Sequence, residues 1–167
     1  MEKNSYYNKL NIVDNFSANN KLPHDNEAEE ILLGALLSDN NSVEYIENGL
    51  SDFHFYVPML GRIFKAVLDL ANKDQIANPL TLDHYFADDS SFKEIGGKNY
   101  LLSLCEGNLG SGIVKDYADL ILELFNKREL IRIAQSIFLN SKKLDYEKNS
   151  SELIEETEAQ LFALTEN

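Results

Sequence analysis

A long helical pattern from Ile113 to about Leu139 constrains the fold more than any other feature of this sequence. The stretch contains neither glycine nor proline, so nothing in it interrupts a helix. At about 100° per residue, one stripe carries apolar side chains at Ile113, Tyr117, Leu120, Leu124, Ile131 and Phe138. A broad opposite side carries Ala118, Leu122, Phe125, Ile133 and Ile137. A helix that is apolar on two sides needs other helices around it.

A second helix is predicted to follow this one. The polar segment "DYEKNSS" (145–151) is a break, and the pattern that follows runs helical through Leu164. Its apolar or small side chains recur at heptad-like spacing, at Ile154, Thr157, Leu161 and Leu164. Two consecutive helices joined by a short polar loop form an antiparallel hairpin.

This hairpin has more apolar surface than one small head covers. The sequence therefore predicts self-association through the side that carries Leu122, Phe125 and Ile133, because exposed apolar patches usually mark interfaces. The alternative is that both apolar sides are covered within one monomer.

The first core helix is predicted to begin within "LPHDNEAEEILLGALLSD" (22–39). Pro23 prevents a helix from running in from upstream. Asn26 is the expected N-cap, with Glu29 closing a capping box. Beyond this start, apolar residues recur at helical spacing at Ala28, Ile31, Leu32, Ala35 and Leu36.

Further helices are predicted at intervals along the next part of the chain. A short helix is expected within 41–49, with Val43 and Ile46 inward, and a longer one from Pro58 as its first residue. Another starts after Pro79 with Thr81 as its cap, and 91–107 turns at two glycines before running helical.

Strand signals are almost absent, so the expected fold class is all-α: a small helical head followed by a long antiparallel helical hairpin. The expected domains are a flexible N-terminal arm at 1–21, the head at 22–110 and the hairpin at 111–167. The arm is rich in Asn, Ser and Lys, although Leu10, Ile12, Val13 and Phe16 could dock elsewhere.

The charge balance argues against strong binding of nucleic acid. The chain has 28 acidic and 15 basic residues, a net charge of −13, whereas gripping a phosphate backbone depends on Lys and Arg. Lys127, Arg128 and Arg132 could make a local basic spot; the alternative is a solvated helix face tempered by Glu123 and Glu129. Little direct DNA binding is expected.

No catalytic, cofactor-binding or metal site is predicted. The three histidines lack close metal-ligand spacing, and "IGGKNY" (95–100) lacks the glycine and hydroxyl residues of a phosphate-binding loop. The His24–Asp25 pair suggests a metal-dependent phosphohydrolase, but Asp25 has an adequate structural role beside the helix start. The chain itself is therefore not expected to be an enzyme.

The single cysteine, Cys105, cannot form an internal disulfide and is expected to be a buried structural thiol. No run of apolar residues approaches membrane-spanning length, and the N-terminus lacks the apolar core of a signal peptide. A reducing cytoplasm is the expected location, without membrane contact.

Seven segments, in order and in register, resemble the N-terminal domain of bacterial replicative DNA helicases, the DnaB family. "LPHDNEAEEILLGALLSDN" (22–40) is similar to that family's "PP-H-x-x-E-A-E-x-x-V-L-G" opening. The others are "DFHFYVPMLGRIFKAVLDL" (52–70), "PLTLDHYF" (79–86), "IGGKNYLLSLCEG" (95–107), "VKDYADLILE" (114–123), "KRELIRIA" (127–134) and "EAQLFALTE" (158–166). The resemblance covers about residues 22–166.

The resemblance implies a function as well as a fold. In this family, a helical head (here about 26–106) and a dimerising hairpin (here about 112–165) build a hexameric collar, a trimer of dimers, that recruits the C-terminal domain of primase. A helicase loader is a further candidate partner. Candidate primase contacts are Ile131, Ile137 and Leu153 on the hairpin, with Glu27 and Tyr100 on the head.

The sequence departs from the full family pattern because it contains no Walker A motif. ATP, magnesium and the unwinding activity are therefore expected in a motor domain outside this chain, which would be the collar domain of a bacterial, nucleoid-associated helicase. The alternative is a stand-alone helical adaptor or dimerisation module that has no motor.

Overall fold

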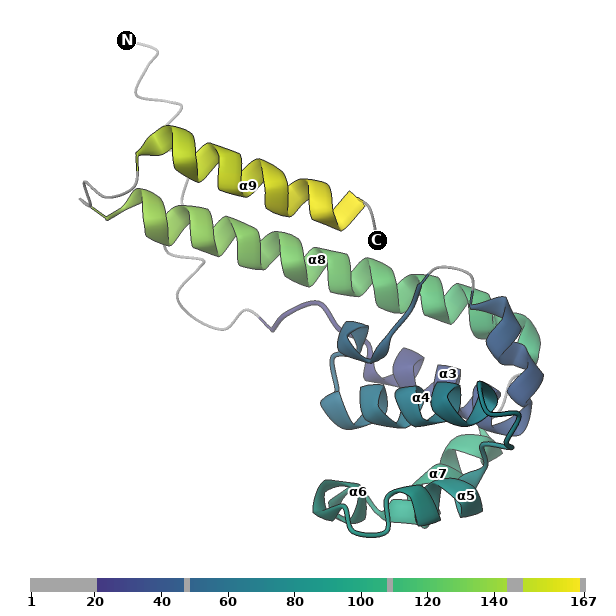
Figure 1. Cartoon of the computed structure of the whole chain (residues 1–167). Coiled ribbons are helices and arrows are strands. Elements are labelled where there is room, and N and C mark those ends of the chain that lie inside the picture. The colour runs from purple at the N-terminus through teal and green to yellow at the C-terminus, as the bar shows by residue number, and fades with distance from the viewer. Residues whose placement is uncertain (1–20, 47–48, 108–109, 144–148, 166–167) are drawn as a thin grey trace. The chain divides into compact units, whose positions relative to one another are not determined.

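The computed structural model describes residues 21–46, 49–107, 110–143 and 149–165, and every regular element in them is helical. The α-helices are α3 (Asn26–Ser38), α4 (Pro58–Ala71), α5 (Pro79–Tyr85), α6 (Ser90–Glu94), α7 (Gly97–Glu106), α8 (Val114–Ser141) and α9 (Ser150–Thr165) (Figure 1). Short 3-10 helices are η1 (Asn40–Tyr45), η2 (Asp52–His54) and η3 (Ser111–Ile113). The all-α prediction is confirmed. Residues 1–20 of the arm expected at 1–21 lie outside the described part of the chain.

The described chain forms two compact units. Residues 24–127 make the first, which we call the head unit, and 21–23 with 128–165 make the second, the hairpin unit. The helix α8 contributes to both, because Val114, Ala118 and Ile121 on its first turns are buried in the core of the head unit. The head unit therefore continues past the boundary expected at 110.

The core of the head unit lies where α3 meets α4 and α7. Its fully buried side chains include Leu32, Leu33, Leu36, Ile63, Phe64, Val67 and Leu101. The helices α3 and α7 approach so closely at Gly34 that an added Cβ would lie 2.3 Å from the carbonyl oxygen of Leu104. Only glycine fits this crossing, which explains the glycine inside an otherwise apolar helix.

The predicted N-cap of α3 is wrong by one residue. Asp25 is the N-cap, and its carboxylate accepts a hydrogen bond from the backbone N–H of Ala28 at 3.0 Å. Because the helix begins at Asn26, Glu29 is the fourth helical residue and lies one position beyond the reach of a capping box. Its side chain is instead buried and accepts hydrogen bonds from the backbone N–H groups of Tyr56 and Val57.

The proline positions mark helix starts as predicted, with local differences. Pro58 is the first residue of α4. Pro79 is the first residue of α5, so Asn78 is the N-cap and the predicted cap, Thr81, instead closes the capping box from the third helical position. The short helix expected within 41–49 is the 3-10 helix η1, and Val43 and Ile46 pack against the core as predicted.

Candidate interaction surface

The hairpin unit is built from the later part of α8 and from α9, which lie side by side and antiparallel (Figure 1). One stretch of their seam is lined by residues that include Ile133 and Ser136 of α8 with Gln160 and Leu164 of α9. The next stretch brings Ile137 and Ser141 against Leu153, Ile154 and Thr157. The predicted antiparallel hairpin is therefore confirmed.

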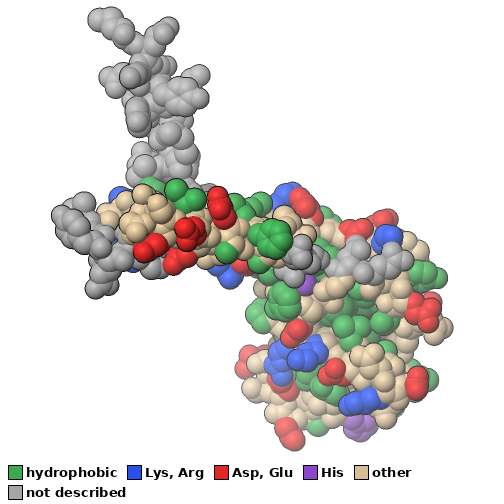
Figure 2. Space-filling model, turned by 45° about the horizontal axis from the view of Figure 1, so that its top comes forward, with side chains coloured by type: hydrophobic (Ala, Val, Ile, Leu, Met, Phe, Trp, Pro, Cys, Tyr) green, Lys and Arg blue, Asp and Glu red, His purple; other side chains and the backbone are tan. Residues whose placement is uncertain are grey.

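The helix α9 has no buried residue. Of its large apolar side chains, Ile154 is 57% exposed, Leu161 40% and Phe162 65%, and on α8 Leu130 is 49% and Leu139 61% exposed. Figure 2 shows hydrophobic side chains among acidic ones on the surface of this unit. Exposed apolar side chains gathered on one element are typical of an interaction surface. The heptad-like spacing does not indicate this surface, because three of its residues, Ile154, Thr157 and Leu164, line the seam with α8.

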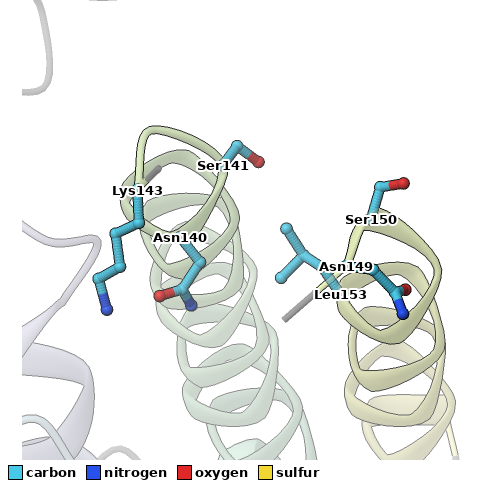
Figure 3. A pocket seen from close by; sticks show the side chains of 6 residues that line it. All are labelled: Asn140, Ser141, Lys143, Asn149, Ser150 and Leu153. Carbon is cyan, nitrogen blue, oxygen red and sulfur yellow. The ribbon is translucent and has the colours of Figure 1, made fainter. Parts of the chain in front are cut away.

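A cavity of about 250 Å³ lies at the end of the hairpin where α8 finishes and α9 begins (Figure 3). Leu153 points from α9 toward α8 there. The remaining lining is neutral or basic: Asn140, Ser141 and Lys143 with Asn149 and Ser150. Asn149 caps α9, because its side chain accepts from the N–H of Glu152 at 3.0 Å and Glu152 accepts from its N–H at 3.2 Å. The cavity is large enough to hold a side chain of a partner. Its lining residues include no acid–base pair for catalysis.

The three residues predicted for self-association already have contacts within the chain. Phe125 makes edge contacts with the rings of Phe53, at a centroid distance of 5.7 Å, and His54, at 4.6 Å. Leu122 is half-buried against the core of the head unit, and Ile133 in the hairpin unit is only 8% exposed. The stripe on the sequence did not reveal the partners of Phe125, because Phe53 and His54 lie some seventy residues earlier in the chain.

The predicted primase contacts fall into two groups. Ile131, Ile137 and Leu153 are half-buried in the hairpin unit, and Leu153 lines the cavity at its end. The other two lie in the head unit, where Glu27 is exposed on α3 and Tyr100 is half-buried on α7.

Tyr100 is held against α3 by Glu30. Its hydroxyl donates a hydrogen bond to Oε1 of Glu30 at 2.8 Å. Burial, together with this hydrogen bond to a carboxylate, raises the pKa of the Tyr100 hydroxyl well above its usual value. Glu27 lies one helical turn before Glu30, so the structure brings Glu27 and Tyr100 to the same side of α3.

The local basic spot considered for Lys127, Arg128 and Arg132 does not form a shared surface. Lys127 pairs with Glu123 at 3.1 Å and Arg132 with Glu129 at 3.2 Å, as the alternative of a tempered helix face predicts. Arg128 differs from both interpretations, because it is buried and donates a hydrogen bond from Nη1 to the carbonyl oxygen of Pro23 at 3.0 Å.

The remaining predictions about chemistry concern single residues. Asp25 has the structural role expected of it, as the cap of α3. Cys105 is half-buried, and burial raises the pKa of its thiol. Among the described residues, no three His, Cys, Asp or Glu side chains gather as metal ligands do, and no helix there is long and apolar enough to cross a membrane.

Comparison with known proteins places these features in a family. The family described as "DnaB-like helicase N terminal domain" matches residues 21–123. The protein named replicative DNA helicase DnaB from Rickettsia conorii is 33% identical over 98% of this chain and 34% of its own length, and that from Rickettsia prowazekii is 35% identical over 95% and 32%. The chain thus spans about a third of the length of these relatives.

Two solved structures share the fold. A crystal structure of the N-terminal domain of DnaB helicase from Mycobacterium tuberculosis has a TM-score of 0.77 at 21% identity and covers 86% of this chain and 99% of that one. A DnaB-like replicative helicase, whose structure is described together with its interactions with primase, has a TM-score of 0.65 at 24% identity and covers 84% of this chain and 31% of that one. With a match over more than half of its residues, the chain belongs to the family of DnaB-like helicase N-terminal domains.

Proposed function

We propose that this chain is the collar domain of a replicative DNA helicase, which joins copies of the helicase to one another and recruits primase at the replication fork. The observation that carries the proposal is the hairpin unit, whose helix α9 has no buried residue, in a chain of this family. A single chain leaves Leu161 40% and Phe162 65% exposed, and fully burying a Leu or Phe contributes roughly 1.5 to 3 kcal/mol.

In this proposal, two-fold pairing of hairpin units brings the same face of two chains together. Leu122, Phe125 and Ile133 remain our candidates for this contact, joined by the exposed side chains of α9. Three such dimers form a hexameric collar, and a helicase loader is a further partner. The collar itself binds little DNA, since each chain carries a net charge of −13.

The motor activity, with ATP and magnesium, belongs in this proposal to another domain of the full-length helicase. Such a protein works in the cytoplasm, at the nucleoid. A stand-alone helical adaptor is the alternative function. Similarity to replicative helicases over nearly the whole chain favours the collar domain.

Sedimentation equilibrium tests self-association. We expect the wild-type chain to dimerise and Leu161→Asp to weaken the dimer while keeping its helix content, because Leu161 is already 40% exposed in one chain. Ser151→Asp is the matched control, since it adds the same charge to the exposed start of α9. A folded wild-type chain that stays monomeric at high concentration contradicts the dimer.

Phe125→Asp tests whether the candidates on α8, and not only the exposed side chains of α9, lie at the dimer contact. The ring of Phe125 contacts Phe53 and His54 in the same chain, so its loss should lower the melting temperature. If Phe125 also lies at the dimer contact, the dimer dissociation constant should rise at temperatures where the variant is still folded.

Titration calorimetry with the C-terminal domain of the cognate primase tests recruitment. We expect weaker binding for Ile137→Asn and Leu153→Asn, which alter the seam and the cavity of the hairpin unit, and for Glu27→Gln and Tyr100→Phe on the head unit. Ile131→Asn belongs to the same series, and Ala134→Asn, at an exposed position of the same helix, is the control. Affinity that is unchanged in every folded variant would remove these residues from the proposed site.

A further inference from the structure

The helix α9 is held by the rest of its chain more loosely than the helices of the head unit are. Its side chains that line the seam with α8 include Leu153, Thr157 and Leu164, and each of these is only half-buried. No residue of α9 is buried, whereas more than half of α3 is. Two spaces of about 330 and 420 Å³ lie along the same seam. Closely packed interiors leave few voids larger than a water molecule, so the seam is incompletely filled in a single chain.

The sequence of α9 also makes this helix weak by itself. Glu152, Glu155 and Glu158 are exposed and three residues apart, so like charges adjoin along the helix. The helix contains neither Lys nor Arg, and its last turn thus has no positive charge to interact with the helix dipole. It has 16 residues, and isolated helices only slightly shorter are marginal in water even when their sequences are favourable.

The helix α8 differs from α9 because its start is fixed. Val114, Ala118 and Ile121 are buried in the core of the head unit. The costly nucleation of α8 is therefore complete, and each further residue only extends an existing helix. The helix α9 begins separately at Ser150 and needs a nucleus of its own. Opening of the hairpin is therefore expected to unwind α9 and to leave α8 helical.

We propose that α9 opens locally in a single chain and closes onto α8 when the hairpin unit pairs with a second copy of the chain. Ile154, Leu161 and Phe162 are 57%, 40% and 65% exposed in one chain, so pairing adds apolar burial that the single chain lacks. Closing of α9 and pairing then support each other, because an open α9 lowers the apparent affinity of the pair. This inference rests on the proposed self-association and adds that the hairpin is completed by it.

Hydrogen exchange of the whole chain tests the opening. At a concentration where sedimentation shows monomers, we expect the amides of α9 to exchange at least about ten-fold faster than those of the facing part of α8, residues 129–141. Their exchange should slow when the concentration is raised until dimers form. Equal exchange of α9 and this part of α8 in the monomer overturns the proposal.

Ala159→Gly measures the coupling between closing and pairing. Ala159 is exposed, and at about 100° per residue it lies on the side of α9 away from Leu153 and Leu164. Glycine disfavours a helix about five-fold relative to alanine, and a dimer orders two copies of α9, so the dimer dissociation constant should rise about 25-fold. The matched control is Ala134→Gly, exposed on α8, which should change it less than about two-fold because α8 stays helical in both states.

Ala159→Gln separates helix propensity from a lost contact. Glutamine keeps a high helix propensity but changes the surface at Ala159, so the dissociation constant should stay within about three-fold of wild type. An unchanged constant in Ala159→Gly, or an equal rise in Ala134→Gly, overturns the proposal. A wild-type chain that never pairs contradicts the collar function and the closing step, whereas hydrogen exchange of that monomer still decides whether α9 opens. The two failures are therefore distinguishable.

Discussion

The carboxylate of Glu29 accepts a hydrogen bond from the backbone N–H of Val57 at 3.2 Å, and this contact joins the first turns of α3 to the start of α4. Val57 is the N-cap residue of α4 and has no side-chain capping group of its own. The first N–H groups of a helix have no partner within it, and a negative charge there is favourable. Glu29 of α3 thus supplies a hydrogen-bond acceptor at the N-terminus of α4, where no side chain of α4 itself acts as a cap.

Replacing this carboxylate should destabilise the head unit. Glu29→Gln removes the charge and one of the two acceptor oxygens while keeping the size, so the N–H of Tyr56 or Val57 loses its partner. We expect the free energy of unfolding to fall by about 2 kcal/mol, measured by urea denaturation. Glu27→Gln, exposed in the same turn, is the control and should change it by less than about 0.5 kcal/mol. Equal effects of the two changes would contradict a specific role for Glu29.

The contact between α3 and α7 should not tolerate a methyl group. In Gly34→Ala the new Cβ would meet the Leu104 carbonyl oxygen at 2.3 Å, and this oxygen is backbone and cannot turn away. We expect a loss of about 1 to 3 kcal/mol in stability, seen as a lower melting temperature. At Gly112 an added Cβ has no atom within 4 Å, so Gly112→Ala should be neutral or slightly stabilising.

The hydrogen bond from Tyr100 to Glu30 should contribute to stability in a way that depends on pH. The pKa of this hydroxyl is raised above its usual value of 10.0, so the stability that the bond contributes is fully present below pH 10 and is lost as pH rises from there through the folded pKa. Tyr100→Phe should therefore cost about 1 kcal/mol at pH 7, and the difference from wild type should shrink above pH 10. Urea unfolding of the wild type and of Tyr100→Phe, at pH 7 and above pH 10, measures this difference in stability. A gap that is independent of pH would assign the effect to packing.

Acid should weaken the contact between α4 and the start of α6. Asp89 caps α6 and pairs with Arg62, and this partner, with the N–H of Phe92, holds the pKa of Asp89 below its usual 3.8. Stability from a carboxyl with a lowered pKa is present above pH 3.8 and is lost as pH falls through the folded value. Asp89→Asn keeps a capping side chain and should melt below wild type at pH 7, with the gap closing toward pH 3. A constant gap would show that the charge is not involved.

Much of the fold follows from local signals in the sequence. Pro58 begins a helix as expected, and α8 runs unbroken because no Gly or Pro interrupts it. The helix expected after Pro79, with Thr81 as its cap, begins two residues before Thr81, at Pro79 itself. The misplaced cap at Asn26 has a local cause, since Asp25 and Asn26 are both good caps and adjacent. The burial of the Glu29 side chain could not be predicted, because the groups that it accepts hydrogen bonds from are backbone N–H groups more than twenty-five residues away.

The candidate interaction surface is harder to predict from the sequence. The apolar periodicity of α8 indicates which side chains need cover, but it cannot say whether that cover comes from the same chain. Phe125 illustrates this, since Phe53 and His54 supply contacts that only the tertiary fold assembles. On α9, Ile154 lines the seam with α8 and is still 57% exposed in one chain.

The side chain of Asn40 links the end of α3 to the segment before α5. Its amide accepts from the N–H of Ala77 at 2.8 Å and donates to the carbonyl oxygens of Ala77, at 2.8 Å, and Leu36, at 2.7 Å. Deamidation to aspartate would remove both donated hydrogen bonds and set a negative charge against two carbonyl oxygens. Exchange of this one amide for a carboxylate would therefore weaken the link between the segment before α5 and the end of α3, and only the hydrogen bond from the N–H of Ala77 would remain.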